Sequence, residues 1–170
     1  MTTASEQLMV ADESVTLRPI NPADSSMEDT FVRNLSLETK HNRFLGGVKE
    51  LSPAELKRLC DVDGYHSMAF VATVQEDGRE TEIGVSRYDE GSNAGVREMA
   101  VTIADAWQHK GVGRLLMQRL IAHARTHGVK RLYSVDLADN MAMRDLASEL
   151  GMNARRDPGD ANQVIYSLTL

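Results

Sequence analysis

A strand-like segment, a turn with two glycines and an amphipathic helix follow one another between Val96 and Gly128. The turn reads Gln-His-Lys-Gly-Val-Gly-Arg over residues 108–114. The first N–H groups of a helix have no partner within the helix, and the helix dipole is positive there. Glycine lets the backbone approach a ligand without a Cβ in the way. The segment therefore predicts an anion-binding loop, and phosphate is the usual occupant of such a loop.

The glycine spacing excludes two common nucleotide-binding loops. A Walker A loop ends in Gly-Lys-Ser/Thr, whereas Lys110 precedes Gly111 here. The dinucleotide fingerprint needs a third glycine, which this turn lacks. The turn instead has the pattern Gln-x-x-Gly-x-Gly from Gln108 to Gly113. The alternative is a turn that only joins a strand to a helix.

The periodicity of the chain predicts a mixed sheet with helices. Alternating or β-branched runs predict strands at Val15–Ile20, Met68–Val74, Thr81–Tyr88, Val96–Ala104, Arg131–Leu137 and Gln163–Leu170. Helices are expected from Asp24 or Ser25 to Leu35, at Pro53–Asp61, from the glycine turn to Gly128, and at Asn140–Leu150. Residues 36–47 are expected to form a loop. The strand–helix–strand order over 96–137 predicts one parallel crossover.

Length and composition predict a single domain. With 170 residues and 42% hydrophobic side chains, the chain is long enough to bury a full core. The net charge of −6 argues against a nucleic-acid binder, and no apolar run approaches the length of a membrane span. Cys60 is the single cysteine, so a reducing, cytoplasmic setting is expected. Residues 1–13 are polar and are expected to form a flexible tail before one domain at 14–170.

Glu98 is the candidate general base. It lies on the strand that leads into the glycine turn, and alternation places it on the same face as Val96 and Ala100. A carboxyl group among such neighbours tends to have a raised pKa, which suits a base that works near neutral pH. The alternative is a solvated glutamate paired with Arg87 or Arg97.

Two other features are expected to be structural. His123 and His127 lie four residues apart on a helix, as metal ligands do, but Arg119 shares their face and no carboxylate motif accompanies them. We therefore expect no metal site and a solvent-facing pair. Cys60 has no basic cluster around it and is expected to pack in the core rather than act as a nucleophile.

These motifs together resemble the GCN5-related N-acetyltransferase (GNAT) family, over nearly the whole chain from about residue 15 to residue 170. The resemblance includes the Glu-Met-Ala-Val run at 98–101, the Gln-x-x-Gly-x-Gly turn, Asn140 and the Leu-Gly-Met run at 150–152. Residues 15–20, 43–44 and 51–53 are similar to the GNAT domain of bacterial protein lysine acetyltransferases. The resemblance implies an α/β (α+β) GNAT fold, with a mixed, mostly antiparallel sheet and helices on both faces.

The resemblance also implies acetyl-CoA as the acetyl donor and coenzyme A as a product. The turn's N–H groups would hold the pyrophosphate, Lys110 and Arg114 would add charge, and unpaired backbone at Val101 and Ile103 would bind the pantetheine arm. Asn140 would touch this arm, cap the last helix, or do both. The full expected cofactor-binding set is Val101, Ile103, Gln108, His109, Lys110, Gly111, Val112, Gly113, Arg114 and Asn140, with Glu98 as the catalytic base.

The chain departs from many family members at Ala147, seven residues after Asn140, where they have a tyrosine that protonates the leaving thiolate. Tyr133 is expected to be a core aromatic. The favoured acceptor is a protein lysine, for example on an acyl-CoA synthetase. The alternatives are a small-molecule amine (a polyamine, an amino sugar or an amino acid) and, in another class, a non-catalytic coenzyme A-binding sensor or interaction module. The oligomeric state stays open, and a homodimer is compatible with the sequence.

Overall fold

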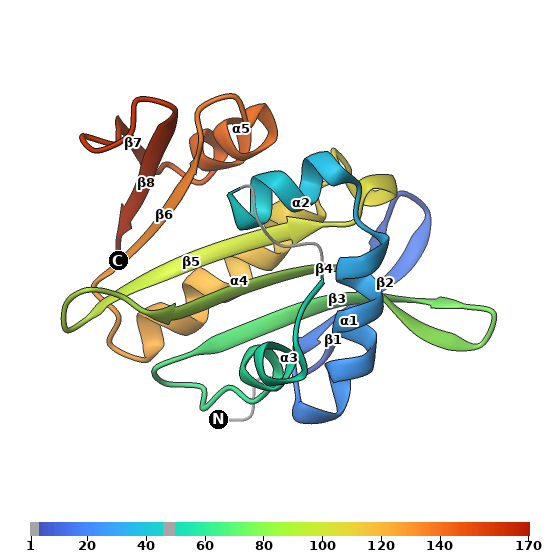
Figure 1. Ribbon diagram of the computed structural model, residues 1–170. Coiled ribbons are helices and arrows are strands. Elements are labelled where there is room, and N and C mark those ends of the chain that lie inside the picture. Colours follow the sequence, from blue (N-terminus) through green and yellow to red (C-terminus); the bar gives the residue numbers. More distant parts are fainter. Residues whose placement is uncertain (1–3, 46–49) are drawn as a thin grey trace.

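The structure is a computed structural model that describes residues 4–45 and 50–170. Within these residues, eight strands form one open sheet in the order β1-β2-β3-β4-β5-β6-β8-β7 (Figure 1). Neighbouring strands are antiparallel except β5 and β6, which are parallel. The strands are β1 (Glu6–Val10), β2 (Glu13–Pro19), β3 (Met68–Glu76), β4 (Arg79–Glu90), β5 (Val96–Ile103), β6 (Arg131–Leu137), β7 (Asn153–Arg156) and β8 (Gln163–Thr169).

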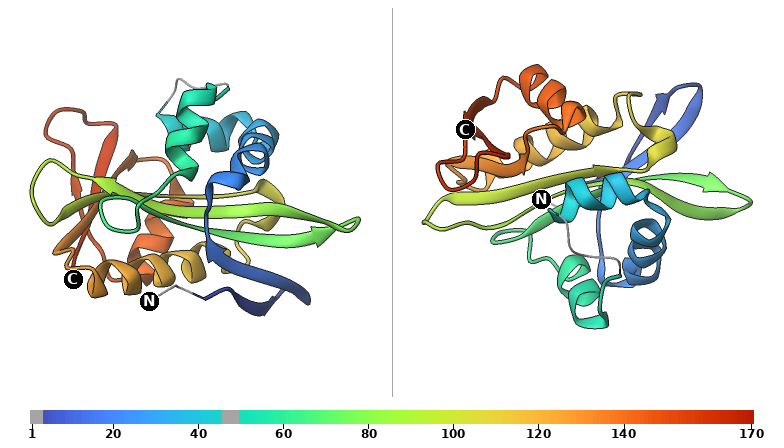
Figure 2. Two further views of the ribbon diagram at one scale, coloured as in Figure 1. Left: turned by 90° about the horizontal axis from the view of Figure 1, so that it is seen from below. Right: turned by 45° about the horizontal axis from the view of Figure 1, so that its top comes forward.

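Helices cover both faces of the sheet (Figure 2). One face carries α1 (Ser25–Asn34), α2 (Leu37–Phe44) and α3 (Pro53–Cys60), and the other carries α4 (Val112–Thr126) and α5 (Met141–Glu149). Two short 3₁₀ turns are η1 (Pro22–Asp24), before α1, and η2 (Asp105–Trp107), before the glycine turn. The predicted α/β fold class is confirmed, and so is the predicted crossover, formed by β5, α4 and β6.

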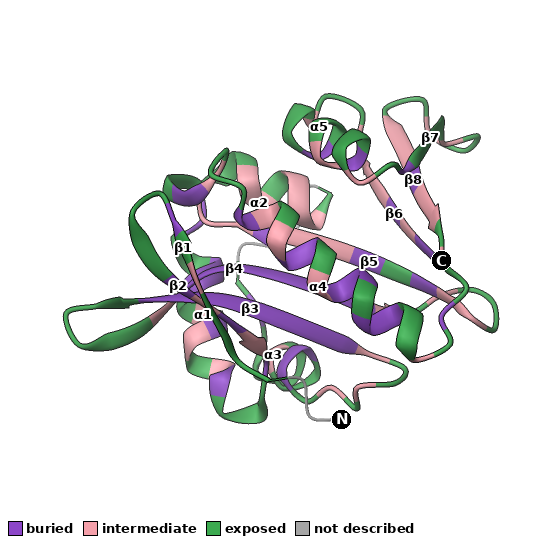
Figure 3. Ribbon diagram, turned by 180° about the vertical axis from the view of Figure 1, so that it is seen from behind, coloured by how far each residue is buried: buried purple, intermediate pink, exposed green. Residues whose placement is uncertain are grey.

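Each face of the sheet buries its own apolar core. On one face, Leu116 and Leu120 of α4 are fully buried in a cluster that includes Phe70 of β3. On the other face, Phe31 of α1 and Leu59 of α3 belong to a second cluster. Figure 3 shows buried residues along the centre of β3 and β4 and on the inner stripe of α4. The packing of α4 on its own face of the sheet therefore fixes its position relative to the end of β5.

The N-terminal segment differs from the expected flexible tail. β1 pairs antiparallel with β2, and Val10 is buried. Ala11 and Asp12 join the strands with positive φ angles of 50° and 66°, as a two-residue hairpin turn requires. Arg119 of α4 donates to the carboxylate of Glu6 at 3.2 Å. Contacts from distant residues therefore order a segment whose own composition is polar.

Residues 36–47 also differ from the expected loop, because residues 37–44 form α2. The hydroxyl of Ser36 caps this helix by accepting the N–H of Thr39 at 3.1 Å. Basic residues near its last turn, such as Arg43, suit the negative end of the helix dipole. Residues 46 and 47 of the expected loop lie outside the described residues. The short strand β7, which is exposed along its length, is a further element that periodicity did not predict.

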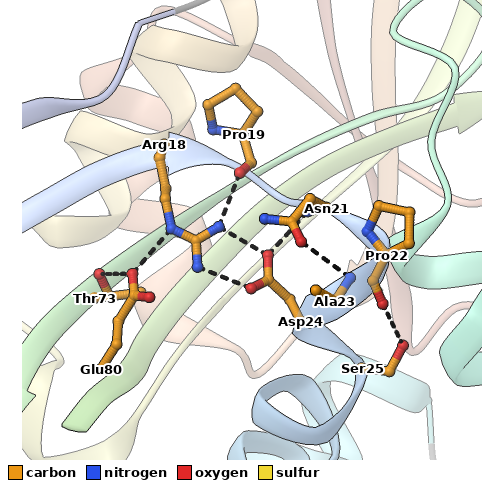
Figure 4. Close-up of polar contacts among 9 residues, drawn as sticks. All are labelled: Arg18, Pro19, Asn21, Pro22, Ala23, Asp24, Ser25, Thr73 and Glu80. Atoms are coloured by element: carbon orange, nitrogen blue, oxygen red, sulfur yellow. Dashed lines mark hydrogen bonds and ion pairs between the residues drawn. The ribbon is translucent and has the colours of Figure 1, made fainter.

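The start of α1 is held by a network around Arg18 rather than by a cap from Asp24 or Ser25. Figure 4 shows the guanidinium of Arg18 donating to both carboxylate oxygens of Asp24, each at 2.8 Å, and to Glu80 at 2.9 Å. The backbone N–H of Asn21 donates to Asp24 at 2.9 Å. Asp24 therefore closes a capping box on η1, while Asn21 supplies the cap.

Candidate active site

The parallel strands β5 and β6 separate partway along their length. Their register pairs are Val96 with Arg131, Arg97 with Leu132, and Glu98 with Tyr133, and within the described residues the ladder ends there. Beyond Glu98, β5 continues to pair with β4 only, up to Ile103 opposite Gly84. One edge of β5 therefore lacks a strand partner across Val101 and Ile103, as the family resemblance implies for these positions.

A cavity of about 660 Å³ lies where the strands separate. Its wall is built from α2, the second half of β5, the glycine turn with the start of α4, the end of β6, and α5. Glu98 lies in this wall together with the exposed backbone edge of β5. A volume of this size is typical of a small-molecule or cofactor site.

The glycine turn presents unpaired backbone donors at one end of the cavity. Gly111 is the N-cap of α4, with a φ of 87°, and no side chain of the described residues caps the helix. The first intrahelical bond runs from the N–H of Leu115 to the carbonyl of Gly111, at 3.2 Å. The preceding N–H groups, up to Arg114, are therefore open to an anion, and the positive end of the helix dipole lies beside them.

The α2 helix is fastened to the strand end by two side chains from the segment between β5 and α4. The carboxylate of Asp105 accepts the N–H of Ser36 at 2.9 Å and the hydroxyl of Thr39 at 2.8 Å. The amide of Gln108 donates to the carbonyl of Ile103 and to the hydroxyl of Thr39, both at 3.1 Å. Gln108 therefore positions the cavity wall, a role that its place in the motif does not indicate.

Most of the predicted site residues lie in the cavity wall, and two do not. The wall includes Glu98, Val101, Ile103, Gln108, His109, Gly111, Gly113, Arg114 and Asn140. Val112 is buried beneath the turn instead. Lys110 does not line the cavity, and its ammonium lies 4.8 Å from the centre of the ring of Trp107, which does. The structure thus brings together nine of the eleven predicted positions.

Asn140 is the N-cap of α5. Its side-chain oxygen accepts the N–H of Met143 at 3.1 Å, which confirms the capping role that its position before the helix predicts. Asn140 also belongs to the cavity wall. Capping and ligand contact are compatible, because the cap uses only the side-chain oxygen and leaves the amide donors available.

Two carboxyl groups lie on opposite faces of the split. Glu98 and Thr102 point to the same face of β5, because they are an even number of residues apart on the strand. Thr102 lines a small buried cavity with Arg87 on the face covered by α1–α3. Asp136 points to the same face of β6 as Leu132, which packs in the core beneath α4. Burial raises the pKa of Asp136, opposed by the hydroxyl of Ser134 and the charge of Arg43. Asp136 is a functional candidate that sequence reasoning missed.

Arg43 brings positive charge to the α2 side of the cavity. Its guanidinium lies 5.0 Å from the centre of the Phe44 ring. Burial, and the neighbouring charge of Arg87, lower the pKa of Arg43 to about 10, while Glu28 and Asp136 oppose this shift. Arg43 therefore remains a cation at neutral pH, and its charge acts to lower the pKa of Asp136.

The family tyrosine position is part of the core in this chain. Ala147 is 1% exposed and packs with α4 and α5, outside the cavity wall. Tyr133 is half-buried rather than fully buried in the core as expected. Burial raises its pKa, and the charge of Glu98 raises it further. It lies beside Glu98 in the register and is not part of the wall.

Cys60 and the histidine pair lie outside the cavity wall and pack against other parts of the protein. Cys60 is fully buried, as expected, and burial raises the pKa of its thiol. The expectation of a solvent-facing histidine pair is wrong for His123, which is buried with its ring nitrogen 2.9 Å from the carbonyl of Gly64 and its ring stacked on His127. The described residues contain no group of three or more His, Cys, Asp or Glu side chains placed to hold a metal. None of their helices is both long enough and apolar enough to cross a membrane.

Comparison with known families matches residues 14–153 to the acetyltransferase (GNAT) domain. The chain therefore belongs to the GNAT family of acetyltransferases. It is similar to Acetyltransferase PA5475 of Pseudomonas aeruginosa, with 49% identity over 92% of this chain and 84% of that protein. It is also similar to Acetyltransferase Pat of Mycolicibacterium smegmatis, with 36% identity over 79% of this chain, and the match spans 40% of Pat.

Solved structures share the fold. The GNAT domain of S. lividans PAT superposes with a TM-score of 0.87 at 24% identity, covering 98% of this chain and 97% of that domain. The yncA protein of Salmonella typhimurium, solved with its cofactor acetyl-CoA, has a TM-score of 0.72 at 21% identity, covering 92% of this chain and 94% of yncA. At these identities the likeness shows the fold.

Proposed function

We propose that this acetyltransferase transfers the acetyl group of acetyl-CoA directly to an amine, and that the favoured acceptor is a protein lysine. The observation that carries the proposal is the meeting, in one cavity, of an unpaired strand edge, an uncapped helix N-terminus and the carboxylate of Glu98. Each of these features suits one part of the reaction.

The residues present fit coenzyme A. Its pyrophosphate carries negative charge that suits the open N–H groups from Val112 to Arg114, and its amide-containing arm suits the free backbone groups of Val101 and Ile103. A Cβ added at Gly113 would lie in ordinary contact with Leu146 at 3.5 Å, so any larger side chain at this position would be confined by Leu146 and Ile103. When bound, acetyl-CoA supplies an acetyl group activated as a thioester.

Glu98 is placed to deprotonate the acceptor. An ammonium group cannot attack a thioester because its lone pair is occupied, so a base is needed at neutral pH. Glu98 is exposed, lies at the point where β5 and β6 separate, and is on the face covered by α2. We infer that the amine approaches from this face while the cofactor occupies the opposite side, next to α4.

The acceptor assignment is supported by the charge of the wall and by similarity to Pat. Exposed carboxylates in the wall include Glu38, Asp139 and Glu149, which favour a cationic group such as the lysine ammonium. The chain is 36% identical to Acetyltransferase Pat over the matched region. A small-molecule amine is the second candidate, because the same carboxylates would also attract a polyamine.

A turnover screen tests the proposal. Thiol release from acetyl-CoA is measured with lysine peptides, intact acyl-CoA synthetases, polyamines, amino sugars and amino acids as acceptors. Turnover that is highest with a protein or peptide lysine, and that falls in Glu98→Gln, is the expected result. Higher turnover with a small amine would mean that the acceptor is that amine rather than a protein lysine. Binding of coenzyme A by calorimetry without turnover on any amine would instead indicate a non-catalytic sensor.

A further inference from the structure

Asp136 is the least exposed carboxyl group in the cavity wall. The other carboxyl groups of the described wall are exposed, whereas Asp136 is half-buried near the end of β6. One of its oxygens accepts the hydroxyl of Ser134, and the other accepts no hydrogen bond from the described residues. Asp136 therefore combines burial, access to the cavity and a carboxyl oxygen available to a ligand.

The strand register places Asp136 beside the cofactor side of the split. Glu98 pairs with Tyr133, so three residues further on Val101 and Asp136 face each other across the gap between β5 and β6. Alternation puts Asp136 on the α4 face, the side of the open helix N-terminus, and puts Glu98 on the α2 face. The two carboxyl groups thus flank the split from opposite sides.

We propose that Asp136 is the general acid that protonates the sulfur of the departing coenzyme A; this inference rests on the function proposed above. The neutral amine forms a nitrogen–carbon bond to the acetyl group, and the carbon–sulfur bond breaks with its electron pair on sulfur. The carboxyl proton of Asp136 moves to that sulfur. Glu98 takes one proton from the ammonium before the attack and a second from the nitrogen after the new bond forms, and it releases each to solvent. Asp136 then recovers its proton from solvent.

The surroundings of Asp136 act on its pKa in both directions. Burial and the neighbouring Glu98 raise its pKa, while Ser134 and the cation of Arg43 on α2 oppose the increase. The charges of Arg43 from α2 and Glu98 from β5 act on Asp136, and Asp136 in turn acts on Tyr166 from β8. Arg114 from α4 and Asp145 and Glu149 from α5 line the same cavity.

Neither of the two positions considered for a phenol donor supplies one to the cavity wall. Ala147 occupies the family tyrosine position and is buried in the core. Tyr133 lies beside Glu98 on the opposite face of the strands from Asp136. The carboxyl group of Asp136 therefore takes the place of a phenol donor, and it does so from a strand rather than from α5.

The first test is Asp136→Asn, which keeps the shape of the side chain and removes the transferable proton. We expect kcat to fall by about 100-fold or more, with the affinity for acetyl-CoA and the acceptor KM unchanged. The alkaline limb of the wild-type kcat–pH profile, which reports deprotonation of Asp136, should disappear. Asp12→Asn, in the β1–β2 turn, is the matched control and should behave as wild type.

The second test moves the pKa of Asp136 without replacing it. The Ser134 hydroxyl stabilises the carboxylate, so Ser134→Ala should raise the pKa of Asp136 and shift the alkaline limb to higher pH. A residue with only a structural role would leave the position of this limb unchanged. An unshifted limb in Ser134→Ala, in a folded protein, would overturn the proposal.

A readout without turnover tests contact with the sulfur. In ¹³C NMR of aspartate-labelled protein, the resonance lost in Asp136→Asn should titrate above the ordinary aspartate range. Its titration should change on addition of coenzyme A but not of desulfo-coenzyme A, which lacks the thiol. Equal effects of the two ligands, or full kcat in Asp136→Asn, would reject Asp136 as the acid. Failure of wild-type protein to bind coenzyme A or turn over acetyl-CoA would instead reject the proposed function.

Discussion

Glu98 of β5 and Tyr133 of β6 form the last register pair before the two parallel strands separate. Up to this pair the strands share a ladder, and beyond it the edge of β5 faces the cavity. The proposed base therefore sits where a rigid, fully paired strand becomes an open binding edge. Its position is set by the sheet rather than by a loop, which favours a well-defined orientation.

Replacing Glu98 tests its role as the base. Glu98→Gln keeps the size of the side chain but cannot accept the amine proton, so turnover should fall by about 100-fold or more, most steeply on the acidic side of the optimum. Acetyl-CoA affinity in calorimetry should stay close to that of wild type. Glu76→Gln, at the exposed end of β3, is the control and should have full activity. Unchanged turnover of Glu98→Gln at every pH would remove Glu98 as the base.

Gly111 tests the anion-binding turn. Its φ of 87° strains any residue with a Cβ, although a Cβ there would meet open space in the described structure. Gly111→Val should therefore distort the turn and abolish measurable acetyl-CoA binding in calorimetry, with circular dichroism unchanged. Gly78→Val is a matched control, because Gly78 has a φ of 76° and open space in the β3–β4 turn. Loss of binding in both variants, or in neither, would contradict the pyrophosphate assignment.

The site could be predicted from sequence where local pattern determines structure. The glycine turn, the helix after it and the flanking strands depend on periodicity and on a φ angle that glycine allows, all within residues 96–137. The capping role of Asn140 follows from a side chain next to its own helix.

The features that were missed depend on distant residues. The α2 helix is short and polar, and its first turn is held by Asp105, which is 69 residues away from Ser36 in the sequence. Nothing next to Asp136 in the sequence distinguishes it from other aspartates, because its burial and its place at the split come from strand pairing. Local periodicity carries no information about such contacts, so sequence reasoning could not find them.

The network of Arg18 predicts the response of stability to acid. Burial alone would raise the pKa of Asp24, but hydrogen bonds from Arg18 and from the backbone N–H of Asn21 outweigh burial, so the pKa of Asp24 is lowered. The hydrogen bond from Arg18 also lowers the pKa of Glu80. A lowered carboxyl pKa contributes stability above its ordinary value and loses it as pH falls. Wild type should therefore lose more unfolding free energy between about pH 6 and about pH 3 than Arg18→Met does.

Arg18→Met should also lower the unfolding free energy near neutral pH by about 2 kcal/mol, a value below that of a fully buried pair because this one is partly exposed. Urea denaturation measures both effects. Arg33→Met is the matched control, because Arg33 is half-exposed and pairs with Asp29 on the same helix. It should change stability little. Equal losses in the two variants would show that the Arg18 network is no stronger than a surface pair.

A buried carboxyl pair beneath α1 predicts the opposite pH dependence. Glu82 is 4% exposed, and within the described residues neither of its carboxyl oxygens has a hydrogen-bond partner. Arg87 donates to Glu28 at 2.8 Å, so this one cation is already paired. Burial, and then the neighbouring Glu28, raise the pKa of Glu82 well above its ordinary value. Between the ordinary and the raised pKa, the folded protein therefore holds a proton on Glu82 that the unfolded chain releases.

A raised carboxyl pKa makes the folded state less stable as pH increases, because folding must then take up a proton. Glu82→Gln keeps the shape of the side chain and removes this requirement. The variant should gain in thermal midpoint relative to wild type as pH rises from about 5 to about 8. Glu76→Gln, at an exposed position of β3, should follow wild type throughout. Parallel curves for wild type and Glu82→Gln would mean that Glu82 is ionised in the folded protein, with Arg87 compensating both carboxylates.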